Sequence, residues 1–374
     1  MIPVPHSQRS LERILPAACD AVGLGSGLSR DVRADRMALD VPEAARVCVV
    51  VVDGLGWLNV SARFGHAATL RSWHAAEPLM TVVPSTTAAA ITAVGTGLRP
   101  GQSAMLSYEL RSPATGKNFS LISWEQSGMD PRTWQSQPTL FESLGEEAAH
   151  CALVQQASFV GSGLTLAALR GARTIVAEGL EARVRAASSA LHAGTKLVYL
   201  YWGELDHIGH KRGWNSSQWT RALEELDAGM ALLERSVPRG TLILLTADHG
   251  MIDVTERIDV AQFPTLLDGV SLVSGEERAL HLYADDPDAV AARWEAQLGD
   301  VSWIATKKQA LAGRVFGATS EFAASVMGDV LVFQKGTFAL VDSRMREPGR
   351  PFMVGVHGSV TEPEMMVPLL MALT

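Results

Sequence analysis

Short runs of apolar residues recur along the chain, at 47–52, 152–154, 197–201 and 242–246. Continuous apolar runs of this length are typical of strands that are buried on both faces of a sheet. Between them, apolar residues at helical spacing predict helices over 85–94, 165–173 and 216–235. Strands that alternate with helices predict an α/β fold with a mostly parallel central sheet and helices on both faces. Ligands bind beyond the carboxyl ends of the strands in such sheets.

A different pattern lies between residues 272 and 342. Strands are predicted over 278–284, 301–306 and 330–341, and a helix over 287–298. Because the core pattern resumes near 352–356, we interpret the chain as one domain, 1–374, with a small α+β insertion at 272–342. The alternative is that these strands extend the main sheet. Residues 106–134, rich in Ser, Gly and Trp, are predicted to form a long excursion near the site.

Composition and charge exclude several classes of protein. The chain has 374 residues, of which 47% are hydrophobic, which excludes overall disorder. With 32 Lys and Arg against 40 Asp and Glu, the net charge of -8 gives no support to binding of a nucleic-acid polymer. The apolar runs are far shorter than the roughly 20 residues that cross a bilayer. No secretory pattern opens the chain, so we expect a cytoplasmic protein. The cysteines, Cys19, Cys48 and Cys151, predict neither a disulfide framework nor a zinc site.

Two of the predicted strands end in a carboxylate. Asp53 follows the run at 49–52, and Asp248 with His249 follows the run at 244–246. Either Asp alone is explained equally well as a cap of the following turn. The adjacent His249 changes the interpretation, because Asp and His together supply oxygen and nitrogen ligands for a divalent transition metal.

A third strand end and the C-terminal region carry further candidate ligands. Asp206 and His210 are four residues apart and share one face of a helical turn. His357 lies between two neighbouring glycines that allow close backbone approach. Each feature alone is more often structural, and His207 is interpreted as a surface or outer residue. Together with Asp53, Asp248 and His249 they make two sets of three ligands, which predicts two metals with open coordination positions.

Three hydroxyl residues, Ser85, Thr86 and Thr87, precede a helix of small residues. The plain interpretation is an N-cap. The alternative is a nucleophile, because a helix N-terminus attracts a phosphate and a nearby metal activates a hydroxyl. The predicted metal ligands favour the nucleophile.

The chain resembles the alkaline phosphatase superfamily, in particular its type I phosphodiesterase/nucleotide pyrophosphatase branch. The resemblance rests on Val-Asp-Gly-Leu-Gly at 52–56, Pro-Ser-Thr-Thr at 84–87, Gly-Thr-Gly-Leu-Arg-Pro-Gly at 95–101, Tyr-Trp-Gly-Glu-Leu-Asp at 201–206 followed by His210, Thr-Ala-Asp-His-Gly-Met at 246–251, and Val-His-Gly at 356–358. It implies that Thr87 is the nucleophile and binds one metal ion with Asp53, Asp248 and His249. Asp206, His210 and His357 would hold the other.

The resemblance implies a two-metal phosphoric ester hydrolase, most simply a phosphodiesterase or nucleotide pyrophosphatase with a phosphothreonine intermediate at Thr87. Zinc is the expected metal and manganese the alternative. The expected partner is a small phosphate ester such as a nucleotide, with no membrane; the oligomeric state is not predicted. Alternatives are a phosphomonoesterase or phosphonate hydrolase with the same site, and more remotely a non-catalytic metal-binding protein.

Two features bear on the substrate. Nucleotide pyrophosphatases of the better-known type carry an Asn three residues after the nucleophile, where its amide can help to hold a phosphate oxygen. This chain departs from the pattern with Ala90 at that position, so the contact is expected from the Thr87 backbone amide, the metals or another side chain. Four aromatic residues are candidates to flank an organic arm or a nucleotide base, with packing as the alternative role: Trp57, Tyr108, Trp124 and Trp134.

Overall fold

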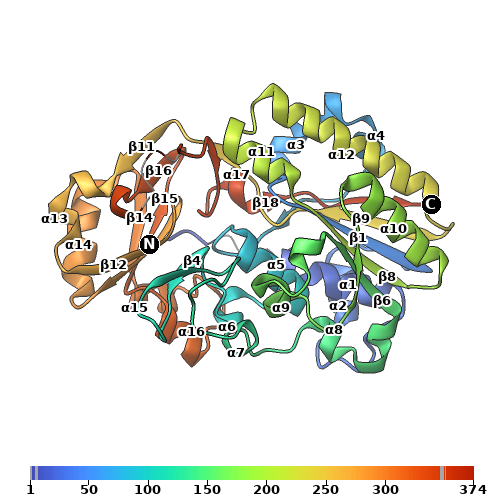
Figure 1. The fold of residues 1–374 in the computed structure, drawn as a ribbon, viewed down its shortest axis with the longest axis horizontal. Helices are drawn as coiled ribbons and strands as arrows, with labels where there is room; N and C mark the ends of the chain where they lie inside the picture. The colour runs from blue at the N-terminus through green and yellow to red at the C-terminus, as the bar shows by residue number, and fades with distance from the viewer. Residues whose placement is uncertain (1, 5–6, 346–348, 350) are drawn as a thin grey trace.

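A computed structural model describes residues 2–4, 7–345, 349 and 351–374 (Figure 1). Its centre is a seven-stranded sheet in the order β2-β19-β9-β1-β8-β6-β7. The bounds of these strands are β1 Arg46–Val52, β2 His74–Ala75, β6 Cys151–Gln155, β7 Arg173–Val176, β8 Leu197–Trp202, β9 Thr241–Thr246 and β19 Leu370–Leu373. The five strands from β9 to β7 run parallel, whereas β19 is antiparallel to β9.

Helices cover both faces of this sheet, which confirms the predicted α/β fold (Figure 1). On one face lie α1 Ile14–Ala21, α2 Val32–Ala38, α5 Thr87–Thr96 and α9 Gly163–Ala168. On the other lie α4 Ala68–Ser72, α10 Leu180–His192, α11 Glu204–Arg212 and α12 Ser217–Ser236. The Ser216 side chain caps α12 by accepting a hydrogen bond from the Trp219 amide. No helix in the described part of the chain is long and apolar enough to cross a membrane.

The register of the central strands fixes where the site lies. Strand β1 is buried from Val47 to Val52 because it lies between two other strands and under helices on both sides. Val52 pairs with Trp202 of β8, and Val51 pairs with Thr246 of β9. The carboxyl ends of three adjacent parallel strands therefore meet at one edge, and the segments that follow them lie side by side.

A second, antiparallel sheet has the order β12-β13-β15-β14 and shares no strand with the first sheet in the described chain. Its bounds are β12 Val270–Glu276, β13 Ala279–Ala284, β14 Ser302–Thr306 and β15 Val330–Gln334, with α14 Pro287–Leu298 beside it. Leu282 and Trp294 are fully buried in the core between sheet and helix. The interpretation of 272–342 as an insertion within one domain remains a prediction.

Two boundary predictions were wrong. The strand predicted over 330–341 is two strands, because the chain turns at Gly336, and β16 Phe338–Val341 pairs instead with β11 Glu256–Asp259. The helix predicted over 165–173 ends at Ala168, and Arg173 already begins β7. Between them Gly171 adopts a φ of 106° against the backbone of Glu142, a conformation that a helix cannot contain.

The remaining elements are short. They are α3 Trp57–Ser61, α6 Pro100–Ser103, α7 Pro131–Trp134, α8 Leu140–Ser143, α13 Pro264–Leu267, α15 Lys307–Ala312, α16 Glu321–Val326, α17 Glu362–Met365, β3 Leu79–Met80, β4 Glu109–Arg111, β5 Asn118–Ser120, β10 Ile252–Asp253, β17 Gly355–Val356 and β18 Met366–Val367. Strands β4 and β5 form a hairpin within the predicted excursion.

Two buried contacts attach the second sheet to the rest of the protein. Arg278, just before β13, makes a bidentate ion pair with Glu364 of α17, and neither side chain is exposed. His281 of β13 accepts a hydrogen bond from the Gly328 amide at 3.0 Å through Nδ1 and donates one to the Leu106 carbonyl at 3.2 Å through Nε2. The two hydrogen bonds of His281 require a neutral imidazole, because Nδ1 accepts one of them and therefore cannot carry a proton.

We expect His281 to make stability depend on pH. Burial lowers its pKa to about 4 from an ordinary value of 6.5, so between these values the unfolded chain binds a proton that the folded protein excludes. Stability is therefore complete above pH 6.5 and falls with acidification, by about 2 kcal/mol at pH 5. Other groups of the protein titrate over the same range, so the test is a difference: in denaturant unfolding at pH 7.5 and 5.0, the change in stability of the wild type should be less favourable than that of His281→Gln by about 2 kcal/mol. Equal losses in both proteins would contradict the assignment.

Candidate metal centre

The structure brings the six predicted ligands together at the carboxyl edge of the central sheet. They form two groups of three, and within each group the ligand atoms lie within 4.8 Å of one another. The first triad is Asp53, Asp248 and His249, and the second triad is Asp206, His210 and His357. Asp53 follows β1, Asp248 and His249 follow β9, Asp206 and His210 lie on α11 after β8, and His357 follows β17.

The first triad is buried. His249 Nε2 lies 3.3 Å from Asp53 Oδ1 and 3.4 Å from Asp248 Oδ2. Asp248 Oδ1 accepts hydrogen bonds from the backbone amides of Gly54 and His249, at 3.1 and 3.0 Å. These amides fix the carboxylate and leave Oδ2 buried without a hydrogen-bond partner.

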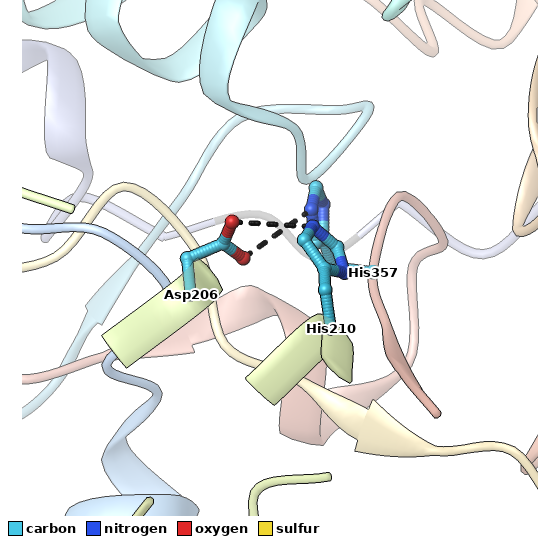
Figure 2. Close-up of side chains that lie close together, drawn as sticks. All are labelled: Asp206, His210 and His357. Carbon is cyan, nitrogen blue, oxygen red and sulfur yellow. Dashed lines mark ion pairs between the residues drawn. The ribbon is translucent and has the colours of Figure 1, made fainter. Parts of the chain in front are cut away.

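The second triad is more open to solvent. His210 Nε2 lies 3.1 Å from Asp206 Oδ2, and His357 Nε2 lies 3.7 Å from Asp206 Oδ1 (Figure 2). The side chains of His210 and Asp206 are 24% and 15% exposed, whereas the side chain of His249 is fully buried. Access to the centre is therefore over the second triad.

The backbone fixes the tautomer of all three histidines. Nδ1 donates to the Gly250 carbonyl in His249, to the Gly355 carbonyl in His210 and to the Ser85 carbonyl in His357, at 3.1, 2.8 and 2.9 Å. A carbonyl only accepts, so Nδ1 carries the proton and each Nε2 is directed at the carboxylates. Metal-binding histidines are oriented by outer contacts of this kind.

The charged side chains of the site shift one another's pKa values. Burial lowers the pKa of His249, but attraction to Asp248 and Asp53 outweighs burial and raises this pKa to about 10. Burial also opposes the positive charge of His210, and Asp206 outweighs it and raises the pKa to about 9. Burial and repulsion by Asp53 raise the pKa of Asp248 well above its ordinary value. In the protein alone, protonated His249 and His210 therefore supply the positive charge that offsets the carboxylates.

The two triads fit divalent cations. Asp248 Oδ2 and Asp206 Oδ1 are buried without a hydrogen-bond partner, which is costly unless a ligand takes up each oxygen. Carboxylate oxygens and imidazole nitrogens together suit divalent transition metals. Three protein ligands leave coordination positions open, which is typical of catalytic sites rather than structural ones.

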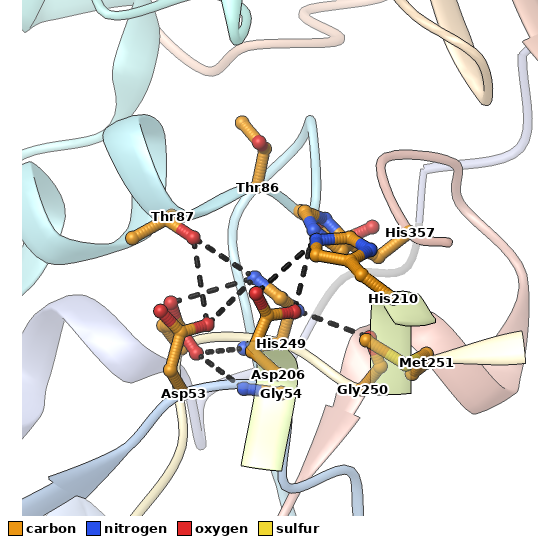
Figure 3. Close-up of polar contacts among 12 residues, drawn as sticks. Asp53, Gly54, Thr86, Thr87, Asp206, His210, His249, Gly250, Met251 and His357 are labelled. Carbon is orange, nitrogen blue, oxygen red and sulfur yellow. Dashed lines mark hydrogen bonds and ion pairs between the residues drawn. The ribbon is translucent and has the colours of Figure 1, made fainter. Parts of the chain in front are cut away.

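Of the three candidate hydroxyls, Thr87 alone is directed at the predicted metal ligands; Figure 3 shows the different directions of Thr86 and Thr87. Thr87 Oγ1 lies 3.1 Å from His249 Nε2 and 3.5 Å from Asp53 Oδ1. Thr86 Oγ1 donates instead to Glu276 Oε2 at 3.0 Å, and Ser85 Oγ donates to the Ser359 carbonyl at 2.6 Å. Thr87 is also less buried than Ser85 and Thr86, so a substrate has access to its hydroxyl.

Sequence reasoning missed two polar residues of this centre. The Tyr201 hydroxyl donates a hydrogen bond to Asp53 Oδ2, and burial raises the pKa of this phenol well above its ordinary value. Glu276, the last residue of β12, lies 3.8 Å from His357 Nδ1 and has its pKa raised by burial to about 8. Tyr201 belongs to a block already singled out, whereas no local motif marks Glu276.

Most of the aromatic candidates pack within the protein. Trp124 and Trp134 are 7% and 1% exposed and contact Phe119 with ring centroids 5.4 and 5.1 Å away. Trp57 packs edge-on against Phe64. Tyr108 is 39% exposed and keeps the candidate role. His207 is exposed and contacts Lys211, as expected for a surface residue.

Gly54 is required by the close approach of two segments. Its φ is 71°, and a Cβ at this position would lie 3.0 Å from Asp206 Cβ and 3.1 Å from Asp206 Cα. Glycine tolerates this conformation and leaves room for the second triad beside the first.

Comparison with known proteins matches most of the chain to one family. The family model described as type I phosphodiesterase/nucleotide pyrophosphatase matches residues 47–360. A phosphopentomutase from Rhizobium johnstonii is 30% identical over 143 residues, which make up 37% of this chain. The match spans only 33% of the mutase's own length.

Solved structures share the fold. An inactive variant of murine ectonucleotide pyrophosphatase/phosphodiesterase 5 in complex with AMP is similar with a TM-score of 0.67 and 15% identity, over 87% of each chain. Phosphonoacetate hydrolase from Sinorhizobium meliloti, in complex with phosphonoformate, is similar with a TM-score of 0.67 and 18% identity, over 87% of this chain and 89% of the hydrolase. At such identities the likeness shows the fold alone.

The two triads predict that the protein binds close to two equivalents of zinc and is stabilised by them, because the cations offset the negative charge of Asp53, Asp248 and Asp206. Elemental analysis after zinc dialysis and desalting should give two equivalents in the wild type and about one in Asp206→Ala. The melting temperature should rise with zinc in both, and less in the variant, since binding at 1,000 times the Kd contributes about 4 kcal/mol per site. One equivalent or none in a wild-type protein that retains activity would contradict the two-metal centre.

Proposed function

The chain belongs to the type I phosphodiesterase/nucleotide pyrophosphatase family, and from that premise we propose that it hydrolyses phosphodiesters or nucleotide pyrophosphates through a phosphothreonine at Thr87. The position of Thr87 carries the proposal, because its hydroxyl lies 3.1 Å from His249 Nε2 and 3.5 Å from Asp53 Oδ1, beside the first triad. The family and its fold support the coarser statement that the protein is a metal-dependent phosphoester hydrolase.

Each triad would hold one cation, the first beside Thr87 and the second nearer the solvent. Zinc is proposed because the donors are carboxylates and imidazoles, with manganese as the alternative. When bound, the two cations supply Lewis-acid stabilisation of the negative charge that develops on the attacking and departing oxygens.

Thr87 performs the covalent step. Thr87 Oγ1 loses its proton to solvent and forms a bond to phosphorus as the opposite bond, to the departing oxygen, breaks in line, and the departing group takes up a proton from solvent where its basicity requires one. A water molecule then attacks the phosphorus and loses one proton to solvent, and the bond to Thr87 Oγ1 breaks as this oxygen takes a proton back. Two displacements with a covalent intermediate replace one more difficult displacement.

Other residues position the reacting groups. Asp53 lies between the Thr87 hydroxyl and Tyr201, whose phenol holds the far oxygen of the carboxylate. Thr87 is the first residue of α5, where the free amides and the helix dipole favour a phosphoryl oxygen. Ala90 is fully buried within the helix, so the backbone takes the role that its side chain does not.

The charges around Thr87 favour a diester over a monoester. Residues 84–94 contain no Lys or Arg that would receive the second negative charge of a monoester. A dianion in this setting lacks the additional positive charge that it requires.

Replacement of Thr87 tests the nucleophile. Thr87→Ala should lower kcat by about 1,000-fold or more because the covalent route is lost, while zinc content is largely retained by the first triad. Thr86→Ala should act far more mildly, because the Thr86 hydroxyl does not face the triads. Steady-state kinetics with elemental analysis checks both variants. Equal losses at unchanged melting temperature would mean that the wrong hydroxyl has been assigned.

Substrate choice tests the diesterase. The zinc-loaded protein should show a larger kcat/KM for bis-aryl or nucleotide phosphodiesters than for the matching monoesters, measured in one chromogenic screen that includes a phosphonate. A monoester or phosphonate preference of about tenfold, equivalent to roughly 1.4 kcal/mol of transition-state stabilisation, would establish the alternative substrate class and leave the assignment of Thr87 unchanged.

A further inference from the structure

The N-terminus of α5 has a cap residue that does not cap. Thr86 occupies the N-cap position, with an extended backbone, and its carbonyl accepts the first helical hydrogen bond from the Ala90 amide at 2.9 Å. A threonine here ordinarily accepts a hydrogen bond from an amide two or three residues later through its hydroxyl. Among the described residues, no side chain makes this bond to α5. The first amides of the helix are therefore left open.

The hydroxyl of Thr86 is held elsewhere by Glu276. Thr86 Oγ1 donates to Glu276 Oε2 at 3.0 Å, and in Figure 3 the Thr86 side chain points away from the triads toward which Thr87 points. The two partners are 190 residues apart in the sequence: Thr86 directly precedes α5, whereas Glu276 ends β12 of the second sheet. The contact thus exists only because β12 is placed against the loop that carries the nucleophile.

Glu276 occupies this position at a cost. Its side chain is 10% exposed, and its second oxygen, Oε1, is buried without a partner. The carboxylate packs against Gly358, where a Cβ would approach Oε1 to 2.9 Å and Cδ to 2.7 Å. A buried carboxyl group with an oxygen that has no hydrogen-bond partner destabilises the folded protein, so its presence calls for a reason other than stability.

We propose that Glu276 is a positioning residue that keeps the N-terminus of α5 open for a non-bridging oxygen of the substrate phosphoryl group. In its absence, the Thr86 hydroxyl would turn to cap the helix and compete with the substrate for the same amides. The inference rests on the proposed phosphoryl-transfer function and extends it. It also predicts that stability and activity respond in opposite directions, since a cap stabilises the helix that the substrate needs open.

The test is a double-mutant cycle on the zinc-loaded protein. Glu276→Ala releases the Thr86 hydroxyl. Thr86→Val is nearly isosteric with threonine but has no hydroxyl that could cap α5. The double variant carries both substitutions. Glu276→Gln keeps an acceptor for the hydroxyl without the charge. Ser274→Ala is the matched control, because Ser274 lies two residues earlier on β12 with a buried hydroxyl that has no partner. For each protein we would measure kcat on a diester, the Kd of inorganic phosphate by calorimetry, zinc content and melting temperature.

Glu276→Ala should lose about 30-fold or more in kcat and bind phosphate about tenfold more weakly, because an anion donor is blocked. Zinc content should be retained. The double variant should recover most of both losses and melt at a lower temperature than Glu276→Ala. Glu276→Gln and Ser274→Ala should stay close to the wild type. A double variant no better than Glu276→Ala, or a Glu276→Ala that equals the wild type, would overturn the proposal.

The two proposals fail in different ways. If the wild type turns over no phosphate ester or phosphonate, the proposed function fails, and the phosphate Kd values still decide the role of Glu276. If the wild type is active but the cycle shows no recovery, only the role of Glu276 fails.

Discussion

Repulsion among buried carboxylates is the constraint to which the rest of the site responds. Asp53 and Asp248 place their ligand oxygens within 4.8 Å of each other, together with His249. Two unit charges at that distance repel by roughly 3–4 kcal/mol at an effective dielectric constant of about 20. Asp206 adds a third negative charge. Backbone amides and the Tyr201 hydroxyl offset part of this cost, and the remaining oxygens need cations.

The fold assembles this site from segments that are distant in sequence. Three parallel strands bring Asp53, Asp206 and Asp248 to one edge, and Gly54 lets the two triads approach. His357 comes from a loop that the Arg278–Glu364 ion pair ties to the second sheet, because Glu364 also accepts the Ser359 amide at 3.0 Å. The second sheet therefore both anchors the loop that carries His357, a proposed metal ligand, and supplies Glu276, which contacts the residue before the proposed nucleophile Thr87.

Much of this arrangement is predictable from local sequence. The apolar runs predict the parallel strands, and a carboxylate directly after such a run, as at Asp53 and Asp248, marks the functional edge. Tertiary contacts are not encoded in this way. Glu276 ends a strand with no motif around it, and its contact with Thr86 depends on how the second sheet packs against the segment before α5. From the sequence, Trp124 and Trp134 are candidates to contact a substrate, but they are buried in the core. The local sequence does not predict this, because burial depends on the neighbours that the fold places around them.

Anomalous diffraction at the zinc edge from crystals of the zinc-loaded protein tests the central claim most directly, because it locates the cations without reference to any activity. The account predicts one peak among Asp53, Asp248 and His249, with Thr87 Oγ1 next to it, and a second peak among Asp206, His210 and His357. A single peak shared by the two triads, or zinc bound elsewhere while these carboxylates remain protonated, would contradict it.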